Sequence, residues 1–130
     1  MAVTTHLVVK SLDHPDESRE PSDLGRVEMV TLGDVTVGRA VFQPGWRWSV
    51  DVRPAAGTSL CEVAHTGYVV SGRQHVRMAD GTEVELQPGD AFVIAPGHDA
   101  WVTGDEPCVT LDFSGNVSQF GAPDEQGGNR

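Results

Sequence analysis

Two histidines and a cysteine stand out as residues whose types could bind a metal ion or move a proton. His65 begins an apolar segment, His98 follows a Pro-Gly turn, and Cys61 ends a loop rich in small residues. Imidazole nitrogen and thiolate sulfur together favour zinc or iron. Each residue also has an ordinary structural interpretation: a hydrogen-bonded histidine, a solvated loop histidine and a small buried thiol. The residue types alone leave both interpretations open.

The other histidines and the second cysteine are weaker candidates for a functional site. His6 and His14 lie near the N-terminus, and His75 alternates with arginines, which is typical of a polar sheet face. Cys108 lies within an apolar segment and is expected in the core. Two cysteines do not make a disulfide framework, so both are expected to be thiols.

Composition narrows the class of protein. The chain has 130 residues, 15 glycines, 8 prolines and a net charge of -10, which favours one turn-rich β domain. The negative charge argues against nucleic acid and against an anionic membrane as partners, because both require clustered Lys and Arg. No apolar run approaches the ~20 residues that span a bilayer, and no secretory signal is evident. We therefore expect a cytoplasmic protein.

Short apolar segments separated by turn signals predict an antiparallel sandwich or barrel. Residues 27–32 and 35–42 are expected to form a hairpin across Gly33-Asp34. Further strands are expected at 46–52, 65–72, 73–78, 82–86, 91–95, 101–104 and 108–113.

Three regions follow from this pattern. Residues 27–115 are expected to form the barrel. Residues 1–26 form an N-terminal arm, in which 7–9 could add an edge strand and the polar remainder is expected to be a surface loop. Residues 116–130 lack apolar periodicity and are expected to be a flexible tail.

Two segments resemble the motifs of the cupin superfamily. The first runs from PGWRWSVDVRP to HTGYVVSG, which ends at Gly72, and the second is GDAFVIAPGHDAW, from Gly89 to Trp101. Together they cover about residues 36–113. The resemblance implies an all-β, cupin-type double-stranded β-helix, that is, a jelly-roll barrel in a single domain.

The resemblance also implies positions for metal ligands. The first cupin motif has a glycine, five residues, His-x-His, a short gap, a glutamate and a later glycine. Counting from its first glycine places the His-x-His pair on Asp51 and Arg53, and counting back from its last glycine places the glutamate on His65. The histidine of the second motif falls on Ala100, and the nearest imidazole is His98.

These positions give a candidate site. Asp51, Cys61, His65 and His98 would hold one transition-metal ion, either iron, zinc, nickel or manganese. Without a metal, His65 and Asp51 could act as acid and base. Arg53 would bind a carboxylate or enolate of the substrate through its planar guanidinium.

The expected strand from Trp46 to Arg53 can be placed in two ways. Simple alternation sends Trp46 and Trp48 to the core and Asp51 with Arg53 to solvent. The cupin register instead points Asp51 and Arg53 into the barrel mouth, and residues 54–64 become an inserted loop. The tryptophan face would then need cover from the arm or a second subunit. We favour the cupin register, because both motifs fit it, and it predicts a homodimer.

Other side chains are expected to line the pocket. Gln74 alternates with Val76 and Met78, which places an amide among core positions, where it would need a ligand or water as partner. Tyr68, Phe92 and Trp101 are candidate pocket walls.

Two functions remain open at this point. In the first, the protein is an enzyme acting on a small organic substrate in the barrel, of the dioxygenase, isomerase or lyase type. In the second, it is a non-catalytic ligand-binding or sensor cupin, since a barrel without its usual ligands can still bind a small molecule.

Overall fold

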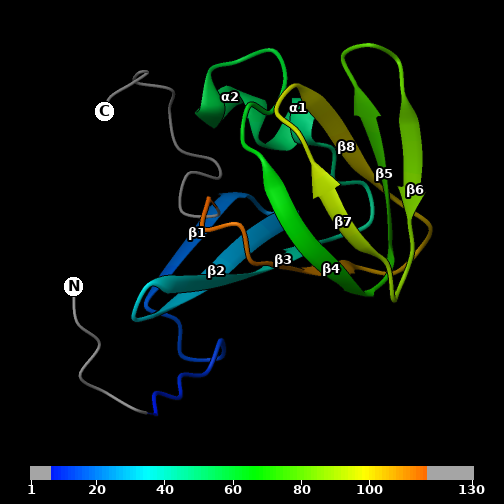
Figure 1. Ribbon diagram of the computed structural model, residues 1–130. Helices are drawn as coiled ribbons and strands as arrows, with labels where there is room; N and C mark the ends of the chain where they lie inside the picture. Colours follow the sequence, from blue (N-terminus) through cyan, green and yellow to red (C-terminus); the bar gives the residue numbers. More distant parts are fainter. Residues whose placement is uncertain (1–6, 117–130) are drawn as a thin grey trace.

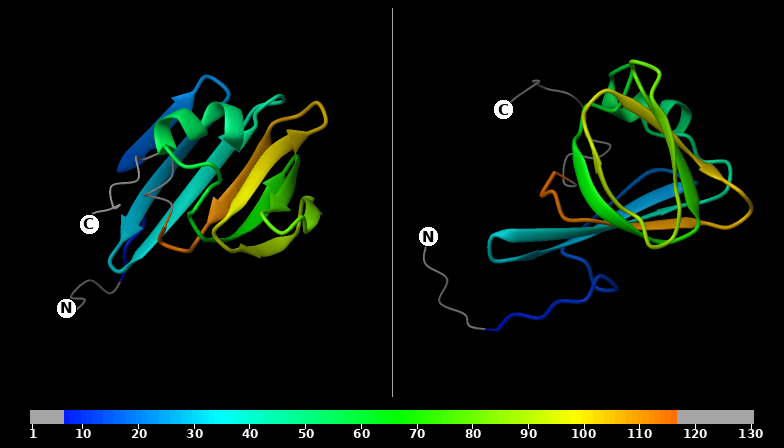
Figure 2. Two further views of the ribbon diagram at one scale, coloured as in Figure 1. Left: turned by 90° about the horizontal axis from the view of Figure 1, so that it is seen from above. Right: turned by 45° about the vertical axis from the view of Figure 1, so that its right-hand side comes forward.

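Two antiparallel sheets face each other in the computed structural model, which describes residues 7–116 (Figure 1). The larger sheet has the order β1-β2-β3-β9-β4-β7, and the smaller sheet has the order β6-β5-β8. The strands are β1 (Glu17–Ser22), β2 (Gly25–Leu32), β3 (Val35–Phe42), β4 (His65–Ser71), β5 (Arg73–Met78), β6 (Glu83–Leu86), β7 (Ala91–Ile94), β8 (His98–Thr103) and β9 (Cys108–Asp112). The sheets curve around a common interior, which Figure 2 shows most clearly in its right-hand view. This arrangement confirms the all-β jelly-roll expected from the sequence.

The β2–β3 hairpin forms as predicted from its alternating pattern. Leu32 pairs with Val35 across a tight turn, and Gly33 has a φ of 63°, a conformation that favours glycine. The inward side chains of this hairpin, among them Val27, Met29 and Phe42, are buried in the core. The hairpin therefore supplies one wall of the interior.

The N-terminal arm differs from its prediction. Residues 7–9 are exposed and form no strand, whereas Glu17–Ser22, expected as a surface loop, forms β1 and pairs with β2. An edge strand has one solvent-facing side, so a polar sequence is compatible with backbone pairing there. Most of the expected tail, residues 117–130, lies outside the described residues.

The predicted strand from Trp46 to Arg53 is wrong. This segment forms two short helices, α1 (Trp48–Asp51) and α2 (Arg53–Ala56). The Asp51 carboxylate accepts a hydrogen bond from the Arg47 backbone N–H at 2.8 Å, which closes the first turn.

The burial of this segment also decides between the two placements. Trp46, Trp48 and Val52 are buried, while Val50 is 66% exposed. The tryptophans therefore belong to the core and do not form an outward face, so the reason given for a homodimer no longer holds.

The Asp99 carboxylate fastens α1 to β8. It accepts hydrogen bonds from the Ser49 backbone N–H at 3.0 Å and from the Arg47 guanidinium at 3.1 Å. These contacts hold Trp48 against the barrel interior. Among residues 7–116, no helix is long and apolar enough to cross a membrane.

Candidate metal centre

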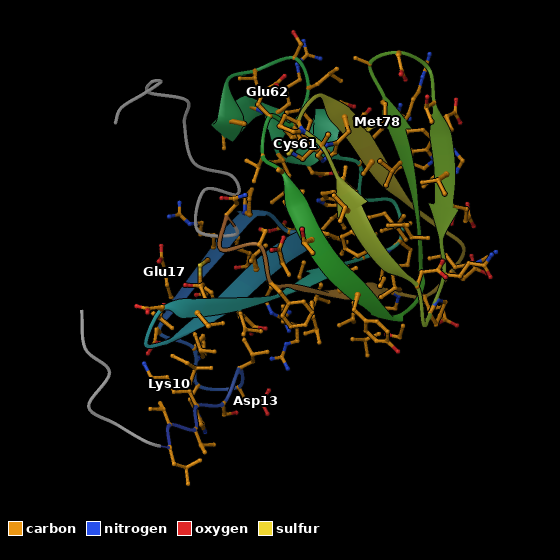
Figure 3. All side chains as sticks on the ribbon, viewed as in Figure 1. Lys10, Asp13, Glu17, Cys61, Glu62 and Met78 are labelled. Atoms are coloured by element: carbon orange, nitrogen blue, oxygen red, sulfur yellow. The ribbon has the colours of Figure 1, made fainter. Side chains whose placement is uncertain are left out.

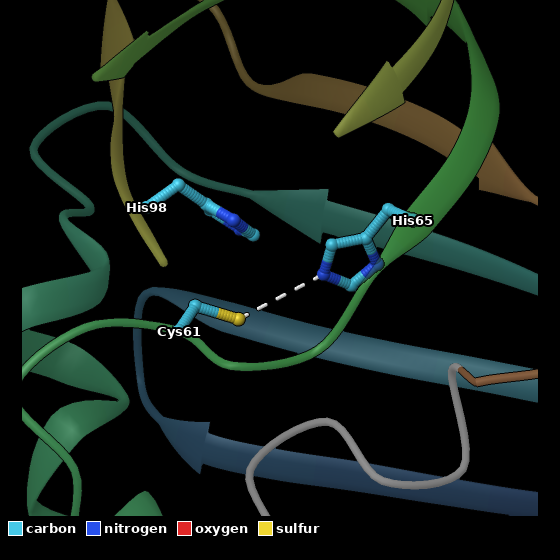
Figure 4. A group of neighbouring side chains, drawn as sticks. All are labelled: Cys61, His65 and His98. Atoms are coloured by element: carbon cyan, nitrogen blue, oxygen red, sulfur yellow. Dashed lines mark hydrogen bonds between the residues drawn. The ribbon is translucent and has the colours of Figure 1, made fainter. Parts of the chain in front are cut away.

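Three side chains with metal-binding atoms converge inside the barrel. The donor atoms of Cys61, His65 and His98 all lie within 4.8 Å of one another (Figure 4). His65 is the first residue of β4 and His98 is the first residue of β8. Figure 3 places Cys61 near α1, at one end of the barrel. Cys61 and His98 are 2% and 4% exposed, so the group is shielded from bulk water.

Backbone pairing brings Cys61 and His98 together. The Cys61 N–H donates to the His98 carbonyl at 2.8 Å, and the His98 N–H donates back to the Cys61 carbonyl at 3.3 Å. Cys61 precedes His65 by only three intervening residues, so the chain places all three donors at the same end of the interior.

Each imidazole is oriented by a partner on its far nitrogen. His65 Nδ1 lies 2.7 Å from the Asp112 carboxylate, and His98 Nδ1 lies 2.9 Å from the Ala95 carbonyl oxygen. A carbonyl oxygen can only accept, so His98 Nδ1 carries the proton. Such partners fix the ring orientation and leave Nε2 available to a metal. His65 Nε2 lies 3.8 Å from Cys61 Sγ.

Asp112 is itself held in place. Its Oδ1 accepts hydrogen bonds from the Ser114 backbone N–H at 2.8 Å and from the Ser114 hydroxyl at 2.6 Å. Burial raises the pKa of Asp112, but hydrogen bonds from His65 and Ser114 outweigh it and hold the pKa below its ordinary value. Asp112 is therefore a carboxylate at neutral pH.

The Cys61–His65 pair is charged in the metal-free protein. Burial alone raises the pKa of Cys61, but hydrogen bonds and charges of His65 and His98 outweigh it and lower the pKa to about 6. Burial lowers the pKa of His65, but Asp112 and Cys61 outweigh it and raise the pKa to about 9. A thiolate beside an imidazolium results.

We expect the thiolate absorbance of metal-free protein to titrate near pH 6. The thiolate should be present above this pH and lost below it, and Cys61→Ser should remove the transition. Cys108 should not contribute at that pH, since burial raises its pKa to about 11. Ultraviolet absorbance measured against pH checks this. A single transition near pH 9 would contradict the ion pair.

The same pair should leave the free energy of unfolding nearly independent of pH between about 6.5 and 9. His65, whose pKa is raised from 6.5, stabilises the fold at low pH and loses that effect as pH rises through 9. Cys61, whose pKa is lowered from 9.0, stabilises at high pH and loses that effect as pH falls through 6. Folded and unfolded chains thus each hold about one proton on the pair, and the two slopes cancel.

A cavity of about 60 Å³ adjoins the three donors. Its lining is mainly apolar and includes Phe42, Trp46, Trp48 and Ile94. Because a cavity needs roughly 10–15 Å³ to hold one water, this cavity has room for a small organic molecule. The other lining residues are Val27, Ala40, Cys61, His65, Gln74, Phe92, His98, Ala100, Thr110 and Asp112.

Asp51 and Arg53 do not reach this cavity. Asp51 caps the turn at Arg47, and Arg53 is exposed beside a separate surface hollow with Ser49 and Thr58. The expected roles of Asp51 as metal ligand or base, and of Arg53 in binding substrate, are therefore corrected. The helical turn at 48–51 removes the alternation on which both roles depended.

Two of the four expected pocket residues line the cavity, Gln74 and Phe92. Tyr68 and Trp101 do not. Tyr68 is 41% exposed, and the Trp101 ring lies 4.2 Å from the Arg47 guanidinium and 4.8 Å from the His75 ring. The prediction that these two side chains line the pocket is therefore wrong. His98, whose structural interpretation was a solvated loop histidine, is buried instead.

The structure explains why the motif was misplaced. If the gap in the motif is three residues long, the His-x-His pair that precedes His65 falls on Ser59 and Cys61. Asp112 was missed because no motif marks it, although it ends a strand whose inward positions alternate.

The chain forms a small jelly-roll barrel in which three metal-binding side chains converge. The model of the cupin domain matches residues 50–114, half of the chain, and the chain belongs to this family. No curated protein matches it.

Solved structures support the same fold. A protein of unknown function from Rhizobium leguminosarum bv. viciae 3841 superposes with a TM-score of 0.60 at 21% identity, covering 84% of this chain and 96% of its own. A DUF1255 protein of unknown function from Acidithiobacillus ferrooxidans gives 0.55 at 25% identity, with 75% and 85% covered. KdgF from Halomonas sp. gives 0.53 at 21% identity, with 83% and 94% covered.

Proposed function

We propose that this cupin is a metal-dependent enzyme that acts on a small organic molecule in the barrel cavity. One zinc or iron(II) ion would be held by Cys61, His65 and His98, and the reaction would be of the dioxygenase, isomerase or lyase type. The observation that carries the proposal is the convergence of three donor atoms at the wall of a cavity.

The donor set fits such an ion. Typical zinc–sulfur and zinc–nitrogen distances of about 2.3 and 2.0–2.1 Å imply roughly 3.6 Å between sulfur and nitrogen in a tetrahedral site. Cys61 Sγ and His65 Nε2 are 3.8 Å apart, close to this value. Three protein donors leave one position for substrate or water, as catalytic zinc sites do.

The chain's own residues would prepare the site in two ways. Asp112 and the Ala95 carbonyl keep the Nδ1 protons in place, so that both Nε2 atoms serve as donors. The apolar walls exclude water, which strengthens electrostatic interactions with bound substrate. When bound, the ion would polarise a substrate oxygen or lower the pKa of a bound water.

Elemental analysis of untagged protein tests the proposal. Cells supplied with iron, zinc, nickel and manganese should give wild-type protein with about one ion per chain, the content of a single three-donor site. Cys61→Ala should contain almost none. Cys108→Ala, which removes the other buried thiol, should keep the wild-type content. Metal-free wild-type protein, even after incubation with each ion, would refute the proposal.

A metal-free cysteine nucleophile is the second candidate. His65 lies between Cys61 and Asp112, 3.8 Å from the thiol and 2.7 Å from the carboxylate. In this arrangement Asp112 would orient His65, and His65 would stabilise the Cys61 thiolate. Under this candidate, protein without metal would react with iodoacetamide at Cys61, and Asp112→Asn would slow that reaction.

A further inference from the structure

Gln74 is a buried amide that faces the cavity without a protein partner. Gln74 is 6% exposed and lines the cavity, and none of the side-chain hydrogen bonds found among residues 7–116 involves its amide. A buried amide without a partner is costly, so such a group in a cavity wall indicates a ligand or water that completes its hydrogen bonds.

The backbone of Gln74 lies several residues along the barrel wall from that of His98. On β5 it pairs with Val102, four residues along β8 from His98. Four residues of strand span about 13 Å, so the long side chains of Gln74 and His98 approach the cavity from separate positions. A ligand bound at the metal would therefore meet Gln74 with its other end.

The charges around the cavity limit which chemical groups the ligand can carry at the end that meets Gln74. The described residues of the lining include no Lys or Arg, and its Asp112 carboxylate lies at the metal end, against His65. A second anionic group at the Gln74 end of the ligand would be buried without a cation beside it, which is unfavourable. The amide of Gln74 can both donate and accept, which suits an uncharged polar group.

We propose that the substrate is a small molecule that binds the metal through one oxygen-bearing group and carries an uncharged hydrogen-bonding group at its other end. Gln74 selects this end by hydrogen bonding and rejects a second anion. The inference rests on the proposed metal centre and adds the substrate class that the centre accepts. Dicarboxylates and phosphate esters fall outside this class.

Malonamate and malonate form a suitable pair of probes, because they have the same shape and differ in whether the second end is neutral or charged. Each is titrated into cobalt(II)-loaded protein, with the cobalt absorption spectrum as readout and cobalt content measured afterwards. Wild-type protein is expected to bind malonamate at least about tenfold more tightly than malonate. Malonate chelates metals well, which makes this comparison stringent.

Gln74→Leu keeps the size of the side chain and removes the amide. This variant should bind malonamate about tenfold more weakly while retaining one cobalt per chain. Arg73→Gln, at the exposed neighbouring position of β5, should behave as wild type. Equal or tighter binding of malonate, no binding of either probe, or unchanged affinity in Gln74→Leu would overturn the inference alone. Failure to bind cobalt would instead refute the metal centre on which it rests.

Discussion

Replacement of His65 by alanine is expected to lower the affinity for zinc by more than about 100-fold. The variant loses one of three protein ligands, and this loss should exceed the 10–100-fold cost of losing an outer partner. It also leaves Asp112 and Cys61 without the imidazole that both contact. Competition with a chromophoric chelator measures the affinity directly.

Asp112→Asn provides the graded comparison. Its amide cannot match the carboxylate as acceptor for His65 Nδ1, so zinc affinity should fall by about 10–100-fold, less than in His65→Ala. Asp105→Asn, at an exposed carboxylate between β8 and β9, should retain wild-type affinity. Equal affinities for all four proteins would place the metal elsewhere.

Gly67→Ala is expected to destabilise the fold by more than about 3 kcal/mol, beyond the usual cost of overpacking. An added Cβ at Gly67 would lie 2.0 Å from the Leu111 carbonyl oxygen and 2.8 Å from the Phe92 ring. Because Gly67 pairs with Asp112, the clash would also push β9 away from β4 and displace Asp112 from His65. Urea unfolding measures the free energy.

Gly33→Ala separates steric clash from backbone strain. Gly33 has a φ of 63°, and an added Cβ there would meet nothing within 4 Å. The expected cost is therefore about 1 kcal/mol, from the backbone conformation alone. If Gly67→Ala were no more destabilising than Gly33→Ala, the close approach of β4 to β9 would be wrong.

Much of the fold could be predicted because glycine and proline mark its turns. The segments on either side of Gly33 and Gly72, and the one that follows Gly89, alternate clearly and form strands where the pattern places them. β8 instead begins at His98, three residues before the expected start at Trp101, and its burial does not alternate. β1 was missed because its strand, Glu17–Ser22, is polar on both faces. Pairing at a sheet edge depends on the backbone, which the side-chain pattern does not report.

The segment from Trp46 to Arg53 shows where alternation fails. Over a few residues, Trp46, Trp48 and Val52 fit both a strand face and the inner side of a short helical turn. Two hydrogen bonds stabilise the helix: a local one from the Arg47 N–H to Asp51 and a long-range one from the Ser49 N–H to Asp99. Neither can be predicted from the spacing of apolar residues.

The candidate site was predictable only in part. Cys61, His65 and His98 could be selected by residue type, but their proximity depends on the pairing of Cys61 with His98 between segments 37 residues apart in sequence. Asp112 comes from β9, far along the chain, and lacked any chemical motif. Counting the cupin motif from Gly45 also placed its His-x-His pair on Asp51 and Arg53, which do not reach the cavity. That count required an insertion before His65.

X-ray absorption at the zinc edge of the zinc-loaded protein tests the central claim most directly. The structure predicts one sulfur at about 2.3 Å and two imidazole nitrogens at about 2.0–2.1 Å, with one further light atom. Cys61→Ser should remove the sulfur shell and leave the imidazole signal. A shell of oxygen atoms without sulfur in the wild-type protein would contradict a centre built from Cys61, His65 and His98.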